Sequence, residues 1–339
     1  MWTFINGDLR PHMTSSPFLV LTAAIVFSYY HTSEVNVRRR KVILFGVLPP
    51  VVGLLGVINT WEFPVSIGLV FLALSMAKAD PGTVGIGNWN FVFDRYHLGI
   101  QNISGRIQRE LRRICMATLI SMMIGVISLV WMFPYYLFHT ATSKGIGLLP
   151  PGSEFVPFLL FFGGFLSLFI LYLSQSIRRR CTWQLVQGKQ AIGLSFGAVL
   201  MLIILITLGP VVALLGILLG VTWTIQRSDL DFEGILILSG LGLLLVNEVL
   251  YAKVYPFDPN APRWNTAYKI FHSTWILWGV GGGVVTVGVL SRSYDRLKET
   301  IDPRAYGFVS TRLRDLAIPA MMILLVITVV IGAMVFPTF

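Results

Sequence analysis

The chain has 339 residues, of which 55% are hydrophobic and 12% are charged, with a formal net charge of +10 and a mean hydropathy of +0.74. Apolar stretches of about 17 to 25 residues recur along it, which excludes a soluble globular domain and predicts a polytopic helical membrane protein. The short alternating segments typical of a transmembrane barrel do not occur.

The apolar stretches predict ten transmembrane helices. In chain order their approximate ranges are 17–33, 41–58, 63–78, 114–137, 156–176, 191–207, 210–226, 233–250, 266–290 and 316–336. The connections at about 79–113 and 291–315 mix Arg with apolar and aromatic residues at helical spacing, which predicts helices lying on the membrane surface. We therefore expect an all-α bundle that forms a single transmembrane domain over residues 1–339.

The basic residues divide unequally between the two sides of this topology. Alternate connections hold 21 of the 26 Lys and Arg residues. By the positive-inside rule these connections are cytoplasmic, so both termini are expected on the outer side of a plasma membrane. Topology and contact with membrane lipids then explain the net charge, and no nucleic-acid partner is expected. Cys115 and Cys181 fall on the cytoplasmic side and predict neither a disulfide nor a metal site.

Three polar clusters fall on the outer side, where packing of the bundle could bring them together. They are Gly7–His12 before the first span, Asn59–Pro64 between the second and third, and Asn247–Trp275 between the eighth and ninth. Glu62 lies in a very short turn of the second cluster, at the depth of the aromatic belt. One interpretation is a partly dehydrated carboxylate that acts as a general base or pairs with a cation. The other is a turn cap that faces water.

The third cluster also places one charged residue inside each of the two spans that flank it. Glu248 and Lys269 each lie about one turn inside the apolar boundary, where a charge is unfavourable. One interpretation pairs them as a structural link between consecutive helices. In the other, Lys269 and Arg263 bind an anionic group such as a phosphate, and Asn265 adds hydrogen-bond donors at a helix N-terminus.

The first cluster raises the question of a metal. Asp8 and His12 are four residues apart and could share a divalent cation such as Mg or Mn, completed by another carboxylate or by substrate oxygens. Pro11 between them predicts an irregular segment. His272, on an aromatic-rich span, is expected to be a packed and hydrogen-bonded histidine rather than a metal ligand.

The three clusters, in this order, resemble the YYY-type integral membrane proteins, a family of archaea and Chloroflexi grouped with the GT-C glycosyltransferases. Members carry a Gly-Asp-Leu-His-Pro-His motif, an Asn-Thr-Trp-Asp-Phe-Pro motif, and Arg-Met-Asn-Thr followed by Phe-Lys and a later Trp. Here Arg10 takes the usual His position and Glu62 replaces Asp. The third motif appears as Arg263-Trp264-Asn265-Thr266, followed by Lys269 and Trp275. The resemblance covers nearly all of this chain but only the middle part of a typical member.

The resemblance implies transfer of a sugar from a polyprenyl-phosphate donor to an acceptor at the outer face. Asp8 or Glu62 would activate the acceptor hydroxyl, and cations would hold the lipid phosphate that leaves. Those cations are Arg10, Arg263 and Lys269. A second hypothesis is a non-catalytic membrane subunit of a larger complex, docked to a protein that supplies the missing family regions. A lipid or solute transporter is the third.

Overall fold

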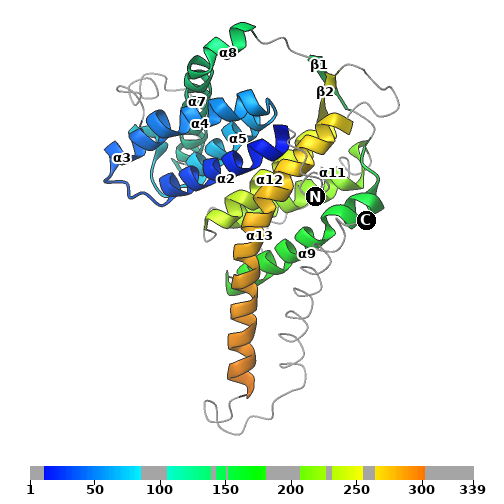
Figure 1. Cartoon of the computed structure of the whole chain (residues 1–339). Helices are drawn as coiled ribbons and strands as arrows, with labels where there is room; N and C mark the ends of the chain where they lie inside the picture. Colours follow the sequence, from blue (N-terminus) through cyan, green and yellow to red (C-terminus); the bar gives the residue numbers. More distant parts are fainter. Residues whose placement is uncertain are drawn as a thin grey trace. The chain divides into compact units, whose positions relative to one another are not determined.

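The computed structural model describes residues 11–84, 105–138, 143–149, 152–180, 207–226, 231–254 and 264–301. Helices dominate these parts of the chain (Figure 1). Six of the described helices are long and apolar enough to cross a membrane, and two shorter apolar helices accompany them. The prediction of a multi-pass helical membrane protein is therefore confirmed. Ten spans and an outer location of both termini stay predictions, because the spans expected near 191–207 and 316–336 fall almost wholly outside the described residues.

The helices and strands follow in a simple order. They are α2 (Pro11–Tyr30), α3 (Val37–Lys41), the π-helical η1 (Val42–Val47), α4 (Leu48–Ile58), α5 (Glu62–Met76), the 3-10 helix η2 (Pro81–Val84), α7 (Gly105–Trp131), α8 (Phe133–Phe138), β1 (Ser143–Leu148), α9 (Phe155–Arg180), α11 (Pro210–Gln226), α12 (Phe232–Val249), β2 (Leu250–Val254) and α13 (Trp264–Ile301). The location of residues 79–113 and 291–315 on the membrane surface stays a prediction. Residues 105–113 and 291–301 continue α7 and α13 instead of forming separate helices.

One compact unit, called unit 2, comprises residues Gly7–Leu148 and Leu238–Leu277. Helices α2, α4, α5 and α7 pack against one another in it (Figure 1). Their shared core is aliphatic, and Leu19, Leu55 and Leu69 have no exposed surface. Gly53 lets α4 cross α7 closely, because a Cβ atom at this position would lie 2.6 Å from the carbonyl oxygen of Ser128. Unit 2 thus brings the segments on either side of Glu62 into one helical core.

The other compact unit, unit 1, comprises Met1–Asn6, Leu149–Ile237 and Trp278–Phe339. Among the described residues of this unit, Trp278 on α13 is the largest side chain with no exposed surface. Its ring lies against three aromatic rings of α9, with centroid distances of 5.0 to 5.8 Å: those of Phe162, Phe165 and Phe169. The indole N–H donates to the carbonyl oxygen of Ile237 at 3.2 Å. The expected single domain over residues 1–339 stays a prediction.

A small antiparallel sheet in unit 2 departs from the all-α prediction. Strand β1 pairs with β2, and Ile146 lies opposite Ala252 while Gly147 lies opposite Tyr251. Gly147 has no side chain, and the Tyr251 ring occupies the space that a Cβ atom would need. Two strands of five and six residues are too short to reveal their alternation in a chain dominated by apolar helices. Strand β2 follows directly on α12 and lies within the third polar cluster.

Candidate functional site

The candidate site centres on Glu62, the first residue of α5. The Glu62 side chain has no exposed surface, and its Oε1 accepts a hydrogen bond of 2.9 Å from Ser273 Oγ on α13. Its second oxygen, Oε2, is buried and has no hydrogen-bond partner among the residues that the structure describes. This contact joins the second and third polar clusters, which are 211 residues apart at these positions. The interpretation in which Glu62 faces water is therefore wrong.

A tight turn places Glu62 at the start of α5. Helix α4 ends at Ile58, and Asn59 takes an extended conformation with φ −146° and ψ 103°. The Glu62 N–H then donates to the Asn59 carbonyl oxygen at 2.8 Å, and the Trp61 N–H donates to Asn59 Oδ1 at 3.4 Å. The first turn of a helix has N–H groups without helical partners, and these favour a carboxylate. The turn therefore gives a buried acidic group partial compensation from the backbone.

The single hydroxyl hydrogen of Ser273 bears on the protonation states of Glu62 that the site accommodates. Ser273 Oγ lies 2.9 Å from Glu62 Oε1 and 3.0 Å from the carbonyl oxygen of Lys269. A hydroxyl has only one hydrogen to donate, so it cannot serve both acceptors at once. Both hydrogen bonds form together when Glu62 carries a proton and donates it to Ser273 Oγ. When Glu62 is ionised, Ser273 donates to the carboxylate instead, so the site is suited to taking up and releasing a proton.

The same stretch of α13 also contacts α2. His272 Nε2 lies 2.9 Å from Ser16 Oγ, which confirms the prediction of a hydrogen-bonded histidine. Thr266 Oγ1 accepts from the Ala252 N–H at 3.0 Å and so ties the start of α13 to β2. Sequence reasoning missed Ser16 and Ser273. The only available signal for Ser273 was its position four residues after Lys269, which places the two on one face of the helix.

Three predicted site residues of the third cluster are described, and they lie on α12 and α13. Glu248 is buried near the end of α12, with 6% of its surface exposed. Lys269 is half-buried on α13, one turn before Ser273, and Asn265 is half-buried at the second position of that helix. These positions agree with either interpretation of the cluster. The interpretation that pairs Glu248 with Lys269 and the one in which Lys269 binds an anionic group both stay predictions.

The side chains of the remaining predicted site residues lie outside the part of the chain that the structure describes. Asp8, Arg10 and Arg263 lie outside the described residues, as does the side chain of His12. Within the described ranges, no group of three or more His, Cys, Asp or Glu residues could hold a metal ion. The Mg or Mn site at Asp8 and His12 therefore stays a prediction.

The fold and the buried polar contact between α5 and α13 define a multi-pass helical membrane protein with a candidate site in one unit of its bundle. The chain belongs to the family described as uncharacterized membrane protein (DUF2298), whose model matches residues 1–278. That match includes all three polar clusters. No curated protein and no solved structure matches the chain.

Proposed function

We propose that this chain is a GT-C-like membrane glycosyltransferase, or part of one, that uses a polyprenyl-phosphate-linked sugar at the outer face of the plasma membrane. The observation that carries this proposal is the buried Glu62 carboxyl group, which has one hydrogen-bonded oxygen and one without a partner among the described residues. The motif resemblance to YYY-type proteins supplies the reaction class. A carboxyl group that can gain and lose a proton is what acceptor activation requires.

In the proposed reaction, the oxygen of an acceptor hydroxyl attacks the anomeric carbon of the sugar. The bond between that carbon and the phosphate oxygen breaks, the polyprenyl phosphate leaves, and the hydroxyl proton passes to Glu62. Asp8 is the second candidate base. Lys269 lies on the face of α13 that carries Ser273, and with Arg10 and Arg263 it would stabilise the charge of the leaving phosphate. Asn265 would orient the phosphate from the start of α13.

Glu62 must become accessible for this chemistry, because its side chain has no exposed surface. Among the described residues, Ser273 is the hydrogen-bond partner of the Glu62 side chain. A hydrogen bond to a charged group contributes about 1.5–3 kcal/mol. Breaking one such contact between α5 and α13 is a small cost beside the barrier of glycosyl transfer. Binding of donor and acceptor could therefore open the site.

Reconstituted full-length chain in liposomes tests the proposal directly. A radiolabelled polyprenyl-phosphate hexose is supplied, and transfer of label to a water-soluble acceptor fraction is measured. Glu62→Gln should lower the rate by roughly 10²–10⁴-fold, the usual contribution of a general base. Glu154→Gln is the matched control, because Glu154 is an exposed carboxylate before α9. The proposal fails if Glu62→Gln, Asp8→Asn and Lys269→Ala each leave transfer unchanged.

Complete burial of Glu62 favours a second candidate, a non-catalytic subunit in which the Glu62–Ser273 contact only holds helices together. In this case the purified chain should show no transfer, and one partner protein should copurify with it at a fixed ratio. Loss of that partner from Ser273→Ala, with transfer absent throughout, would favour the subunit. Transfer by the isolated chain would exclude it.

A further inference from the structure

A buried arginine organises the opposite end of the span that leads to Glu62. Arg40, on α3, has no exposed surface. Its Nη1 donates to Thr83 Oγ1 at 2.7 Å, and its Nη2 donates to the Tyr29 hydroxyl oxygen at 2.9 Å and to the Asp80 carbonyl oxygen at 3.0 Å. The guanidinium carbon also lies 5.2 Å from the centroid of the Tyr29 ring. Arg40 thereby fastens α3 to the end of α2 and to the segment that follows α5.

That segment, residues 77–84, is held from two sides. Thr83 Oγ1 donates to the Asp80 carbonyl oxygen at 2.8 Å, and the Gly82 N–H donates to Asp80 Oδ1 at 2.8 Å. From α7, Arg113 Nη2 donates to the Ala79 carbonyl oxygen at 3.2 Å. The backbone beside Lys78 is therefore held next to α3.

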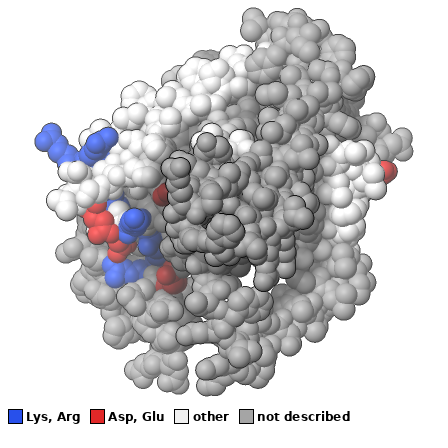
Figure 2. Space-filling view, turned by 90° about the horizontal axis from the view of Figure 1, so that it is seen from below, with Lys and Arg blue, Asp and Glu red and all other residues white. Residues whose placement is uncertain are grey.

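Exposed cations surround this buried network. Arg38, Arg39 and Lys41 are exposed on α3, and Lys78 is exposed in the segment that follows α5. We call these four residues the basic surface. The neighbouring exposed acids, Glu34 and Asp80, offset two of the four charges. Figure 2 shows blue Lys and Arg side chains gathered on one side of the molecule, with red acidic side chains among them. The basic surface keeps an excess of positive charge and is suited to an anion.

Exposed apolar side chains on either side of α3 indicate what kind of anion the basic surface binds. Val35 precedes α3 and is 88% exposed, and Val42 follows Lys41 and is 53% exposed. A soluble phosphate would neutralise the cations but leave these side chains in water. An anionic phospholipid supplies a phosphate for the cations and acyl chains for the valines.

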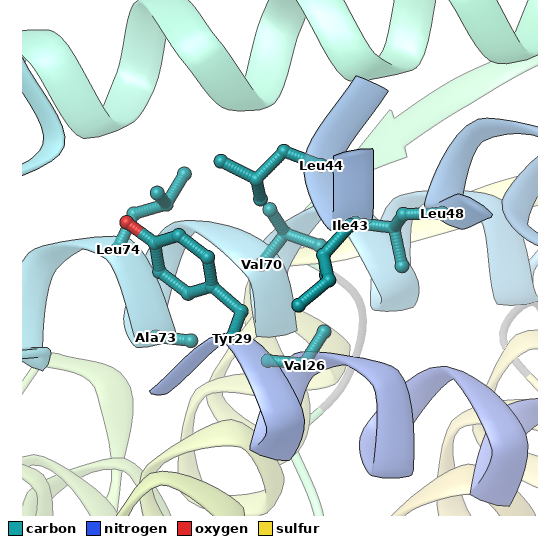
Figure 3. Close-up of a pocket in the computed structure, with 8 residues that line it drawn as sticks. All are labelled: Val26, Tyr29, Ile43, Leu44, Leu48, Val70, Ala73 and Leu74. Carbon is teal, nitrogen blue, oxygen red and sulfur yellow. The ribbon is translucent and has the colours of Figure 1, made fainter. Parts of the chain in front are cut away.

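A small apolar cavity lies behind the basic surface among the described residues. The cavity lies between α2, η1, α4 and α5 and is lined by residues that include Tyr29, Leu44 and Val70 (Figure 3). It has no room for a water-sized molecule. This cavity is therefore not the binding site of a ligand.

We propose that Arg38, Arg39, Lys41 and Lys78 form a binding surface for the phosphate head group of an anionic phospholipid, with its acyl chains along Val42. Arg40 is a positioning residue, because it joins the two segments that carry the cations. The proposal does not depend on glycosyltransferase activity. Each cation near an anionic lipid contributes about 1 kcal/mol, or roughly fivefold in affinity.

Lipid titration of the purified full-length chain in detergent tests this surface. Phosphatidylglycerol is added, and the bound lipid is counted by native mass spectrometry while the rise in melting temperature gives an apparent affinity. Arg39→Gln and Lys41→Gln should each weaken phosphatidylglycerol binding roughly fivefold, and the double variant about 25-fold if the two act independently. Lys253→Gln is the matched control, because Lys253 is an exposed cation on β2. All three positions are exposed, so the variants should fold as the parent does.

Two further additions identify the source of the phosphate. Phosphatidylcholine and inorganic phosphate should each leave the melting temperature unchanged. Equal protection by inorganic phosphate would overturn the lipid assignment. Unchanged phosphatidylglycerol binding in the Arg39→Gln Lys41→Gln variant, or an equal loss in Lys253→Gln, would overturn the proposed location.

Discussion

Arg40 and Glu62 are two charged side chains of unit 2 with no exposed surface, and their surroundings differ sharply. Arg40 makes three hydrogen bonds and stacks on Tyr29, so only its Nε atom lacks a partner among the described residues. Ser273 donates a hydrogen bond to one carboxyl oxygen of Glu62, and none of the described residues makes a hydrogen bond with the other.

The difference in hydrogen bonding indicates that Arg40 has a structural role and that Glu62 is able to react. A buried charge is tolerated when hydrogen bonds replace the water it has lost, as they do around Arg40. A buried carboxyl group with an unused oxygen is less stable in its ionised form and more open to a proton or a substrate hydroxyl. Substitutions at the two positions should therefore have opposite effects on stability.

The largest expected effect is at Arg40. Arg40→Ala removes the charged donor shared by the Tyr29 hydroxyl, Thr83 and the Asp80 carbonyl, so the free energy of unfolding should fall by about 3–5 kcal/mol. Thermal unfolding of the purified protein in detergent measures the loss. Arg39→Ala is the matched control. Arg39 is the exposed neighbour of Arg40, so its substitution should change the free energy of unfolding by less than about 0.5 kcal/mol. Equal effects at the two positions would show that burial of Arg40 contributes nothing.

The next effect concerns the partner of Glu62. Ser273→Ala removes the hydroxyl that serves Glu62 Oε1, and the free energy of unfolding should fall by about 1.5–3 kcal/mol. The same substitution in a Glu62→Gln background should cost about 1 kcal/mol, because a hydrogen bond to a neutral amide contributes less. Ser75→Ala provides the control, since Ser75 donates to the Phe71 carbonyl of its own helix. An equal cost in both backgrounds would mean that Ser273 does not act through the Glu62 charge.

Glu62→Gln should have a smaller effect of opposite sign. The amide keeps the size of the side chain and removes a poorly compensated charge, so stability should rise by about 1–2 kcal/mol at neutral pH. Thermal unfolding measured beside the transfer assay should show a more stable protein that has lost activity. Such a trade-off is typical of sites whose function needs a destabilised group. A fall in stability comparable to that of Arg40→Ala would place Glu62 with the structural charges.

Sequence reasoning found the long helices because their apolar runs exceed the length of a membrane span. It also anticipated that the Asn59–Pro64 and Asn247–Trp275 clusters could meet, and the Glu62–Ser273 contact bears this out for those two. It counted Arg40 among the 21 basic residues of the alternate connections, because a sequence of consecutive cations does not show which one turns inward. The π-helical η1, beginning two residues later, alters the helical phase that would have been needed to decide.

Other features left weaker signals in the sequence. Ser273 is a small hydroxyl residue in an apolar helix, where such residues commonly bond to their own backbone, as Ser273 does to Lys269. Its second contact depends on the packing of α13 against α5, which no local pattern encodes. The β1–β2 pairing depends in the same way on segments more than 100 residues apart.

The smallest expected effect tests whether the ring or the hydroxyl of Tyr29 matters to Arg40. Tyr29→Phe removes the acceptor of Nη2 but keeps the ring, and Nη2 retains the Asp80 carbonyl as an acceptor. The free energy of unfolding should therefore fall by only about 1 kcal/mol. Tyr29→Leu also removes the aromatic face and should cost about 1–2 kcal/mol more, from the lost cation–π contact and lost burial. If both substitutions had no effect, Arg40 would be held by the 77–84 segment alone. The hydrogen bonds of Arg40 to Thr83 and to the Asp80 carbonyl would then alone explain why its charge is better compensated than that of Glu62.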